Sequence, residues 1–380
     1  MGPLTGYKIV EFGSIGPTPY CAMLLADMGA QIVRIDRTEA VELGLKRNPG
    51  YEINRRNRPS IRLDVKAQEG REAALRLIAS ADALIEGFRP GVMERLGLGP
   101  DVCLAANPKL VYGRMTGWGQ EGPLAQTVGH DINYIALAGA LHYLGPKGGA
   151  PLPPLALVGD HGGGGLWLAF GMVCALLEAR RSELGQVVDG AIIDGVTSLL
   201  TPMHGRFEAG GIGKARGENA NDGSRPWYCA YETRDGKWIS IGAIEGRFYA
   251  ELLNKLGLDK EDLPKQHDAA GWPRLHSRFA EVFKQKTRDQ WVALLEGTDV
   301  CFAPVLDLGE LREHPHVRAR GMFQEFEGVT HPAPGPRMSR TPPEIRSGPE
   351  IAGAHTESAL AEWGFSATEI SALKKSGVIA

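Results

Sequence analysis

The sequence predicts an α/β fold with two parts, a large domain built on a parallel β-sheet and a smaller α+β domain. Two observations predict it. In the first third of the 380 residues, short apolar runs alternate with segments of helical periodicity, which is typical of parallel strands joined by crossover helices. After a polar, glycine-rich stretch at about 209–224, the pattern changes to short strands followed by helices. The length also suits two or three domains better than one.

The elements of the first third follow from local signals. Residues 8–12 (KIVEF) form an apolar run that is expected to be the first strand. Residues 17–28 are expected to form a helix, because Pro17 stands near its start and Gly29 follows its end. Similar patterns predict further strands at 31–35, 60–63, 83–86 and 110–115, and a helix at 68–80.

The rest of the chain contains longer helical segments and a second group of strands. Before the glycine-rich stretch, helices are expected at about 131–141, 163–180 and 193–207, with a strand at 187–189. In the smaller part, strands at 227–233 and 237–241 flank the turn Asp235-Gly236. The elements expected after them are helices at 245–256 and 288–295, an extended segment at 328–351, and helices at 355–365 and 367–375.

Composition and charge exclude several classes of protein. The formal net charge is −3, so no basic field favours binding to nucleic acid. The five cysteines are far apart and include no C-x-x-C, which indicates a reducing compartment rather than a disulfide framework. The N-terminus lacks the pattern of a signal peptide, and the longest uncharged apolar stretch, 162–177, is shorter than a membrane span. We therefore expect a cytoplasmic protein without a membrane span.

Common cofactor motifs are incomplete in this sequence. Residues 210–215 (GGIGKA) lack the spacing and the Ser/Thr of a phosphate-binding loop. The turn after the first strand, 13–18 (GSIGPT), is not a dinucleotide fingerprint. His314-Pro315-His316 has no cysteine partner and is expected to be a surface turn rather than a metal site, and no G-x-S-x-G occurs. We expect the protein to use neither a metal nor a separate cofactor.

Three acid/base residues stand where polar segments meet apolar ones. His130 precedes an apolar helix whose dipole lowers an imidazole pKa toward the neutral form, and a plain helix cap explains the same pattern. Asp160 precedes four glycines, 162–165, that open backbone amides at the start of the next helix to a ligand, and the alternative is an N-cap on a closely packed helix. Glu245 ends a strand and begins a helix, where it serves either chemistry or the helix dipole.

Several segments together resemble the class III (CaiB/BaiF-type) CoA-transferases. They are the N-terminal run 6–37, NRPSIRLDVK at 57–66, EGFRPGV at 86–92, RMTGWGQ at 114–120 and GHDINY at 129–134. The resemblance covers nearly the whole chain in order, to about Phe365. GHDINY and the sequence GAIE at 242–245 are similar to the racemase branch of this family and are the specific part of the match.

The resemblance implies a racemase or epimerase that interconverts (2R)- and (2S)-2-methylacyl-CoA thioesters by two-base 1,1-proton transfer through an enolate. His130 and Asp160 would serve opposite faces of the α-carbon, and Glu245 would pair with His130. The alternative is a class III CoA-transferase that moves CoA between carboxylic acids with Asp160 as nucleophile. That enzyme would need neither His130 nor Glu245. A non-catalytic acyl-CoA-binding or sensor protein is a third hypothesis.

The resemblance also implies which residues contact the acyl-CoA substrate. In the family pattern Arg37 lies beside the adenine nucleotide, and Tyr228 lines the cleft that holds the bases. Arginine suits phosphates because its planar group donates two parallel hydrogen bonds. The full implied set is Ile15, Arg37, Leu63, Asp64, Val65, Lys66, Gly87, Phe88, Arg89, Arg95, Gly129, Asp131, Ile132, Asn133, Tyr134 and Tyr228.

The fold that the resemblance implies is a Rossmann-like large domain made from both ends of the chain, with the α+β domain between them. Two chains interlock as rings in this family, so the resemblance implies a homodimer with shared active sites. The implied boundaries are 1–185 and 321–380 for the large CoA-binding domain, 186–224 for a linker helix region, 225–310 for the small domain and 311–320 for a return linker.

The sequence departs from the family pattern at two places near the proposed bases. His161 follows Asp160 where the racemases have an apolar aromatic residue. Ser224-Arg225 replaces a pair of small residues. Neither change touches the proton-transfer residues, but Arg225 is expected to favour a polar or carboxylated acyl group.

Overall fold

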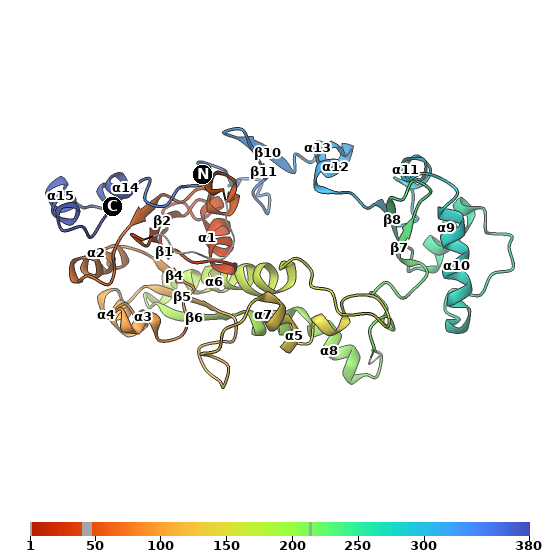
Figure 1. Cartoon of the computed structure of the whole chain (residues 1–380), viewed down its shortest axis with the longest axis horizontal. Coiled ribbons are helices and arrows are strands. Elements are labelled where there is room, and N and C mark those ends of the chain that lie inside the picture. Colours follow the sequence, from red (N-terminus) through yellow and green to blue (C-terminus); the bar gives the residue numbers. More distant parts are fainter. Residues whose placement is uncertain (1, 40–47, 213–214) are drawn as a thin grey trace. The chain divides into compact units, whose positions relative to one another are not determined.

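The computed structural model describes residues 2–39, 48–212 and 215–380, and the chain divides into two compact units (Figure 1). Unit 1 comprises Met1–Ala140, Pro154–Leu200 and Gly321–Ala380. Unit 2 comprises Leu141–Pro153 and Thr201–Arg320. Unit 1 therefore contains both chain ends, while the domain boundaries drawn from the family resemblance stay predictions.

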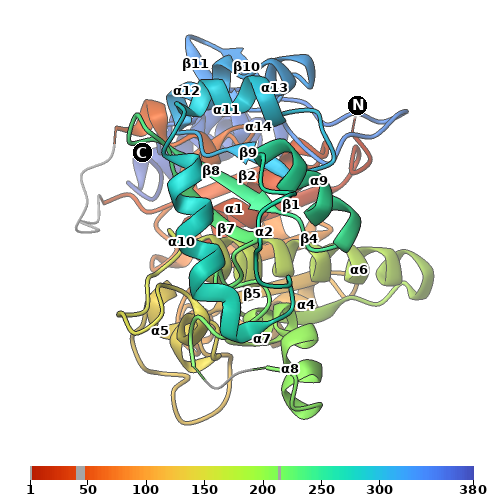
Figure 2. The same ribbon diagram turned by 90° about the vertical axis from the view of Figure 1, so that its right-hand side faces the viewer.

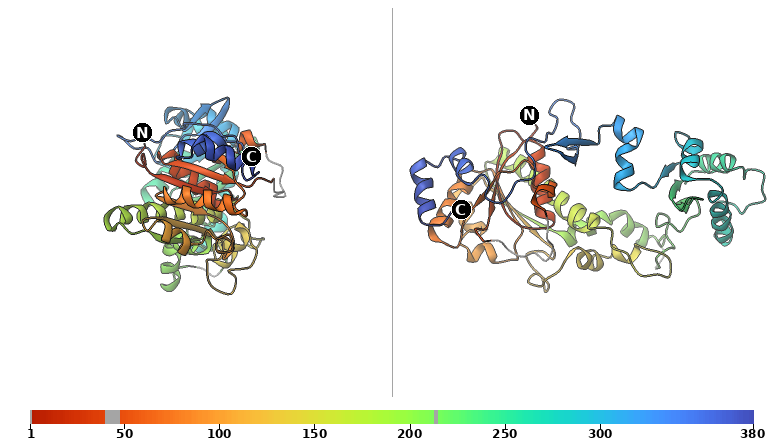
Figure 3. Two further views of the ribbon diagram at one scale, coloured as in Figure 1. Left: turned by 90° about the vertical axis from the view of Figure 1, so that its left-hand side faces the viewer. Right: turned by 45° about the horizontal axis from the view of Figure 1, so that its top comes forward.

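Unit 1 is built on a six-stranded sheet in which every strand pair is parallel (Figure 3). The strands lie in the order β3-β2-β1-β4-β5-β6, and Val10 in β1 is paired with Val33 on one side and Leu84 on the other. Strands β2 and β3 thus follow β1 on one side, and β5 and β6 follow β4 on the other. The boundary between β1 and β4 is therefore the switch point of a doubly wound sheet. The bounds are β1 Lys8–Phe12, β2 Gln31–Asp36, β3 Ser60–Arg62, β4 Ala83–Glu86, β5 Val111–Thr116 and β6 Gln186–Ala191.

Helices cover both faces of this sheet, because strands buried on two sides need apolar partners on each. On one face α2, α14 and α15 pack on the strands around a core that includes Val10, Ile61, Leu77 and Trp363. On the other face lie α1 and α6 (Figure 1). The bounds are α1 Pro17–Asp27, α2 Gln68–Ala79, α3 Val92–Arg95, α4 Pro100–Ala106, α5 Asp131–Leu137, α6 Trp167–Ser182, α7 Ile192–Leu199, α14 Thr356–Glu362 and α15 Ala367–Lys375.

Three helices differ from the sequence prediction for identifiable reasons. The helix expected at 131–141 ends at Leu137, because Gly139 adopts the left-handed backbone conformation at φ 87°. The helix expected at 193–207 is broken into α7 and α8 (Thr201–Glu208), since Pro202 has no amide hydrogen to continue the first of them. The helix expected at 163–180 is preceded by a π-helical segment, η4, which begins at Leu157.

Unit 2 contains a three-stranded antiparallel sheet covered by helices (Figure 2). Its strands are β7 Tyr228–Glu232, β8 Trp238–Gly242 and β9 Phe302–Pro304, and its core includes Trp227, Ile239, Phe279 and Trp291. The predicted α+β character is confirmed. The prediction lacked α10, which carries Pro273 in its first turn. The helices are α9 Gly246–Leu256, α10 Trp272–Phe283, α11 Arg288–Leu295, α12 Leu308–Glu313 and α13 Pro315–Ala319.

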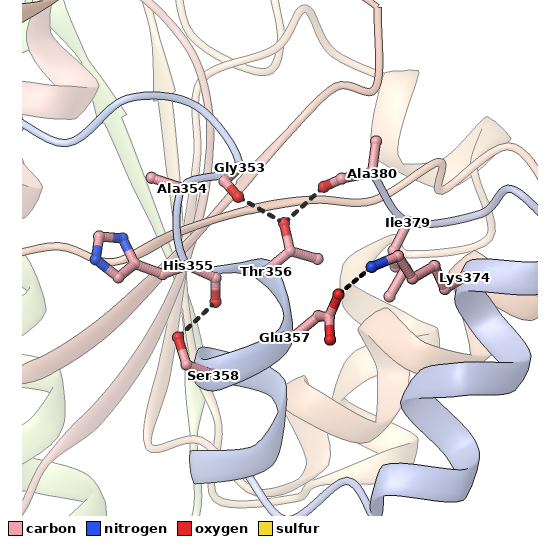
Figure 4. Close-up of a pocket in the computed structure, with 9 residues that line it drawn as sticks. All are labelled: Gly353, Ala354, His355, Thr356, Glu357, Ser358, Lys374, Ile379 and Ala380. Atoms are coloured by element: carbon pink, nitrogen blue, oxygen red, sulfur yellow. Dashed lines mark hydrogen bonds and ion pairs between the residues drawn. The ribbon is translucent and has the colours of Figure 1, made fainter.

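The C-terminal segment returns to unit 1 and closes the free side of β3. A hairpin, β10 Phe323–Phe326 and β11 Val329–Pro332, begins the return, where part of an extended segment was predicted. Thr356 Oγ1 then lies 3.0 Å from the Gly353 carbonyl oxygen and 2.8 Å from that of Ala380 (Figure 4). A cavity of about 370 Å³ lies beside these residues, and none of its lining residues belongs to the set that sequence analysis singled out.

Among the described residues, one helical stretch, Leu157–Ser182, is long and apolar enough by composition to cross a membrane. Half of its most apolar window is buried inside the molecule, and α6 packs on β5 and β6. The buried half of this stretch packs against the sheet of unit 1, and burial of apolar side chains is the ordinary reason for such a composition in a core helix. The sequence predicted a buried helix here.

Candidate active site

The carboxyl ends of β1 and β4 meet at the switch point, where open α/β sheets bind their ligands. The loops that follow these strands are tightly packed together. A Cβ atom on Gly87 would lie 2.2 Å from Thr18 Oγ1 and 3.0 Å from Ser14 Oγ, so only glycine fits there. Gly87 therefore lets the loop after β4 lie directly against the start of α1.

His130 occupies the N-cap of α5, with an extended backbone at φ −131° and ψ 173°. The Asn133 side chain accepts a hydrogen bond of 3.0 Å from the His130 amide. His130 itself is exposed on this part of unit 1. His130 is thus the N-cap residue of α5 by its backbone, and its exposed imidazole lies at the positive end of the helix.

Asp160 lies in the first turn of η4 (Leu157–Leu166), and the N-cap of this helix is Ala156. The N-cap alternative for Asp160 is therefore wrong. The expectation that 162–165 open amides to a ligand is also wrong, because these glycines lie within the helix and serve packing. A Cβ atom on Gly195 of α7 would lie 1.9 Å from the Gly163 carbonyl oxygen, which shows how closely the two backbones approach.

The Asp160 carboxylate is half-buried beside the first turn of α1. A Cβ atom on Gly16 would lie 3.1 Å from Asp160 Oδ2, so the carboxylate packs on the glycine that precedes α1. Burial raises the pKa of Asp160, the Asp131 carboxylate raises it further, and His161 and His130 lower it. His130 and Asp160 thus lie near enough for their charges to interact.

Aromatic rings border this pair on two sides. The Tyr134 ring lies edge-on to Trp118, with centroids 4.8 Å apart, and its hydroxyl donates to the Gly129 carbonyl oxygen at 2.5 Å. Burial and the Asp160 charge raise the pKa of Tyr134, while Arg89 lowers it. His161 packs edge-on against Tyr20 at 4.8 Å. The histidine that departs from the family pattern therefore contacts α1.

Several of the residues implied for CoA follow the carboxyl ends of β2, β3 and β4, which lie within the neighbouring strands β3-β2-β1-β4. Arg37 follows β2, the segment 63–66 follows β3, and Gly87, Phe88 and Arg89 follow β4. The Arg37 guanidinium lies 6.0 Å from the Phe88 ring centroid, and Lys66, Arg89 and Arg95 are exposed. Parallel strands end at one edge of a sheet, so the fold collects these cations there.

Two of the residues implied for substrate contact also stabilise the fold of unit 1. Leu63 is 1% exposed in the core of unit 1, and its amide donates to the Asp36 carbonyl oxygen. The Asp64 amide donates to the Val378 carbonyl oxygen, and the Asp64 side chain accepts from the Lys66 amide at 3.0 Å. Ile15, in contrast, is 45% exposed after β1.

Glu86, the last residue of β4, was not among the predicted site residues. It is fully buried, accepts from the Phe88 amide at 2.7 Å and from Arg114 Nε at 3.0 Å, and its pKa is raised to about 7 by burial. Arg114 also contacts Glu94 through two hydrogen bonds. Glu86 therefore shapes the loop that follows β4. A carboxylate ending an apolar strand was the available signal.

In unit 2, Glu245 is the N-cap of α9 and is exposed, while Tyr228 begins β7 and pairs with Gly242. The buried Gln266 side chain donates to the carbonyl oxygens of Ala243 and Ile244 at 3.1 and 2.9 Å. It therefore fixes the turn that presents Glu245. No sequence signal marked Gln266, because its role depends on contacts some twenty residues away.

Arg225 has a partner within unit 2. Its guanidinium lies over the Trp272 ring, 3.8 Å from the centroid, at cation–π distance. One face of the group is therefore covered by an aromatic ring. Its expected effect on the acyl group stays a prediction.

Among the described residues, no group of three or more His, Cys, Asp or Glu side chains is arranged to hold a metal ion. His314 caps α13, and its Nε2 lies 2.9 Å from Glu296 Oε1.

The strand order defines a doubly wound α/β protein, in which Asp160 lies beside the glycine that precedes α1 and its amide donates to Asp131, the residue that follows His130. The chain belongs to CoA-transferase family III, whose model matches residues 4–356. This confirms the family resemblance and the fold class.

Relatives and a solved structure agree with this assignment. The α-methylacyl-CoA racemase of Mus musculus is 43% identical over 380 residues, covering 99% of this chain and 97% of the relative. The α-methylacyl-CoA racemase of Homo sapiens is 40% identical over 385 residues, with the same coverage. A crystal structure of a CaiB/BaiF family protein from Brucella suis has a TM-score of 0.81 and 26% identity, covering 95% of this chain and 99% of that chain.

Proposed function

We propose that this protein is a racemase that interconverts the two epimers of 2-methylacyl-CoA thioesters. The observation that carries the proposal is that His130, the N-cap of α5, and Asp160 of η4 are brought together, because the Asp160 amide donates a hydrogen bond of 2.7 Å to Asp131, the residue that follows His130. The similarity to two α-methylacyl-CoA racemases along nearly their whole length supports the substrate class. The substrate itself supplies CoA, so no separate cofactor is part of the proposal.

The proposed reaction moves one proton off the α-carbon and another onto its opposite face. One of His130 and Asp160 accepts the α-proton, the thioester carbonyl becomes an enolate, and the other residue donates a proton from the far side. The reverse reaction exchanges their roles. Positioned acid/base groups of this kind contribute about 10²–10⁴-fold in rate. A raised Asp160 pKa favours this exchange of roles, because Asp160 then holds a proton at higher pH than an ordinary aspartate does.

The cations at the carboxyl edge of the sheet are the proposed partners of the CoA phosphates. Arg37, Lys66, Arg89 and Arg95 follow the ends of β2, β3 and β4, or lie close to them in sequence. We further propose, from the family pattern, that Glu245 pairs with His130 and that two chains share active sites in a homodimer. The five cysteines are free, which supports a cytoplasmic location, and the proposed substrates place the enzyme in lipid metabolism.

Isotope exchange tests the proposed function directly. The enzyme is incubated with one epimer of a 2-methylacyl-CoA in deuterated buffer, without a second carboxylic acid. We expect deuterium at C2 together with inversion. In a parallel incubation with an added free acid, CoA transfer to that acid with no label at C2 would instead support the CoA-transferase hypothesis. Binding of the thioester with neither reaction would support a non-catalytic acyl-CoA-binding protein.

The pH dependence should reflect the raised pKa of Asp160. The basic form is lost as the pH falls through this pKa, so exchange of the epimer deprotonated by Asp160 should decline in acid. Its acid limb should lie above the ordinary aspartate value of about 3.9. Profiles of kcat/KM for exchange, measured separately for each epimer, check this. An acid limb at or below the ordinary aspartate value in either profile would contradict it.

Activity should not depend on a metal ion or a nicotinamide. The reaction is proton transfer alone, and the sequence contains neither metal-ligand spacing nor a dinucleotide fingerprint. Enzyme treated with a chelator and dialysed should retain its full rate of racemisation. Loss of rate that returns when a divalent metal is added back would refute this expectation.

The active species should be a dimer. The family resemblance implies interlocked chains, and the segments expected to permit this, about 209–224 and 306–322, are long and polar. Residues 213 and 214 of the first segment lie outside the described residues. Light scattering at the assay concentration, combined with rate measurements across a dilution series, checks the prediction. A fully active monomer would disprove it.

A further inference from the structure

We propose that Asp131 is a positioning residue whose carboxylate holds Asp160 in place relative to His130. The inference rests on the proposed function. The family pattern placed Asp131 among the substrate contacts, but its carboxylate has a partner within the protein: Asp131 Oδ2 accepts a hydrogen bond of 2.7 Å from the Asp160 amide. Asp131 directly follows His130 in the chain, so this bond connects the Asp160 backbone to the residue beside His130.

The contact is built into the packing of α5 on η4. A Cβ atom on Gly159 would lie 2.1 Å from Asp131 Oδ2 and 3.0 Å from Ile135 Cγ2. Gly159 is not among the glycines with positive φ, so its backbone does not itself require glycine. Space for the Asp131 carboxylate explains the glycine. An aspartate that only complemented the dipole of α5 would need no such space.

The same carboxylate also places a negative charge beside Asp160. The charged groups around Asp160 are Asp131 and His130 from α5 and His161 from its own helix, and Asp160 in turn acts on Tyr134. Asp131 raises the Asp160 pKa, while both histidines lower it. The hydrogen bond and the charge are therefore two separable contributions of one side chain.

Two substitutions separate these contributions. Asp131→Asn keeps an oxygen acceptor for the Asp160 amide but removes the charge. We expect kcat within a few-fold of wild type and an acid limb displaced to lower pH for the epimer that Asp160 deprotonates. Asp131→Ala removes both contributions. We expect its kcat to fall by about 10²-fold with little change in KM, because misplacing a reacting group by about 1 Å has an effect of that size.

Asp101 provides the matched control, because it is an exposed aspartate in the first turn of α4. Asp101→Asn and Asp101→Ala should leave both kcat and the pH profile unchanged. Circular dichroism and thermal melting establish that each variant is folded. If Asp131→Ala does not fold, the pH profile of Asp131→Asn still decides the question.

The outcomes distinguish this proposal from the proposed function. Wild-type enzyme that racemises, together with an Asp131→Asn profile that is not displaced and an Asp131→Ala variant with normal kcat, would overturn the role of Asp131 alone. An unchanged acid limb in Asp131→Asn would likewise overturn it if Asp131→Ala is unfolded. Wild-type enzyme that does not racemise would overturn the proposed function and the role of Asp131 with it.

Discussion

Replacing either His130 or Asp160 with alanine should reduce racemisation by several orders of magnitude, because inversion needs an acid on one face of the enolate and a base on the other. Loss of a positioned acid/base group alone removes about 10²–10⁴-fold. Rates of inversion, followed by chiral analysis of the acyl group after hydrolysis, check the prediction.

Proton exchange should survive where inversion does not. In deuterated buffer, each variant is expected to exchange the α-proton of one epimer only, and the two variants should act on opposite epimers. The remaining base removes and returns a proton on its own face without inverting the centre. Exchange of the same epimer by both variants would contradict the assignment of one base to each face.

Glu245→Gln provides a graded comparison. If Glu245 holds and tunes the His130 imidazole, this variant should resemble a mild form of His130→Ala. The CoA-transferase hypothesis predicts a different set of results, in which Asp160→Ala is inactive and His130→Ala keeps most of its activity. Normal racemisation by His130→Ala would therefore overturn the racemase proposal.

Arg58→Met should strongly destabilise unit 1. Arg58 and Glu11 are both fully buried, and Arg58 Nε lies 2.9 Å from Glu11 Oε2. Arg58 also donates to the carbonyl oxygens of Pro19, at 2.9 Å, and Asn54. Removing the guanidinium leaves the Glu11 carboxylate buried without its partner, which typically lowers the free energy of unfolding by about 3–5 kcal/mol. Unfolding in urea, followed by circular dichroism, measures the change.

Two further variants show whether the unpaired charge is the cause. The double variant Glu11→Leu/Arg58→Met should recover much of the lost stability, because both charges are then gone. Arg76→Ala breaks an ion pair with Glu369 in which both side chains are over two-fifths exposed, so it should change stability far less. Equal effects of Arg58→Met and Arg76→Ala would contradict this explanation.

The pH dependence of Arg58→Met follows from the buried Glu11. Burial already raises the pKa of Glu11, and Arg58 lowers it, so removal of Arg58 should raise it further. When folding raises the pKa of a carboxyl group, the free energy of unfolding falls as the pH rises from the pKa of the unfolded state through that of the folded state. The stability of the variant should therefore be closest to that of wild type in acid, and the difference in stability should be largest at pH values above that interval.

The sequence by itself determined the features that local signals encode. Local sequence patterns located all six strands of the parallel sheet, and Pro17 with Gly29 located α1, because strand periodicity and helix ends depend on neighbouring residues. His130, Asp160 and Glu245 were visible because titratable side chains stood at the borders of apolar segments. Their combination with GHDINY and GAIE also placed the chain in its family.

Only the tertiary structure decided the strand order, the π-helical setting of Asp160 and the bond from the Asp160 amide to Asp131. The last of these joins positions 29 residues apart, and its space depends on the absence of a side chain at Gly159. Likewise, Gln266 acts on Ala243 and Ile244, and Glu86 acts through Arg114 of the next strand. Such contacts arise when separate elements pack, so no local periodicity records them, and the shifted pKa of Asp160 follows from that packing.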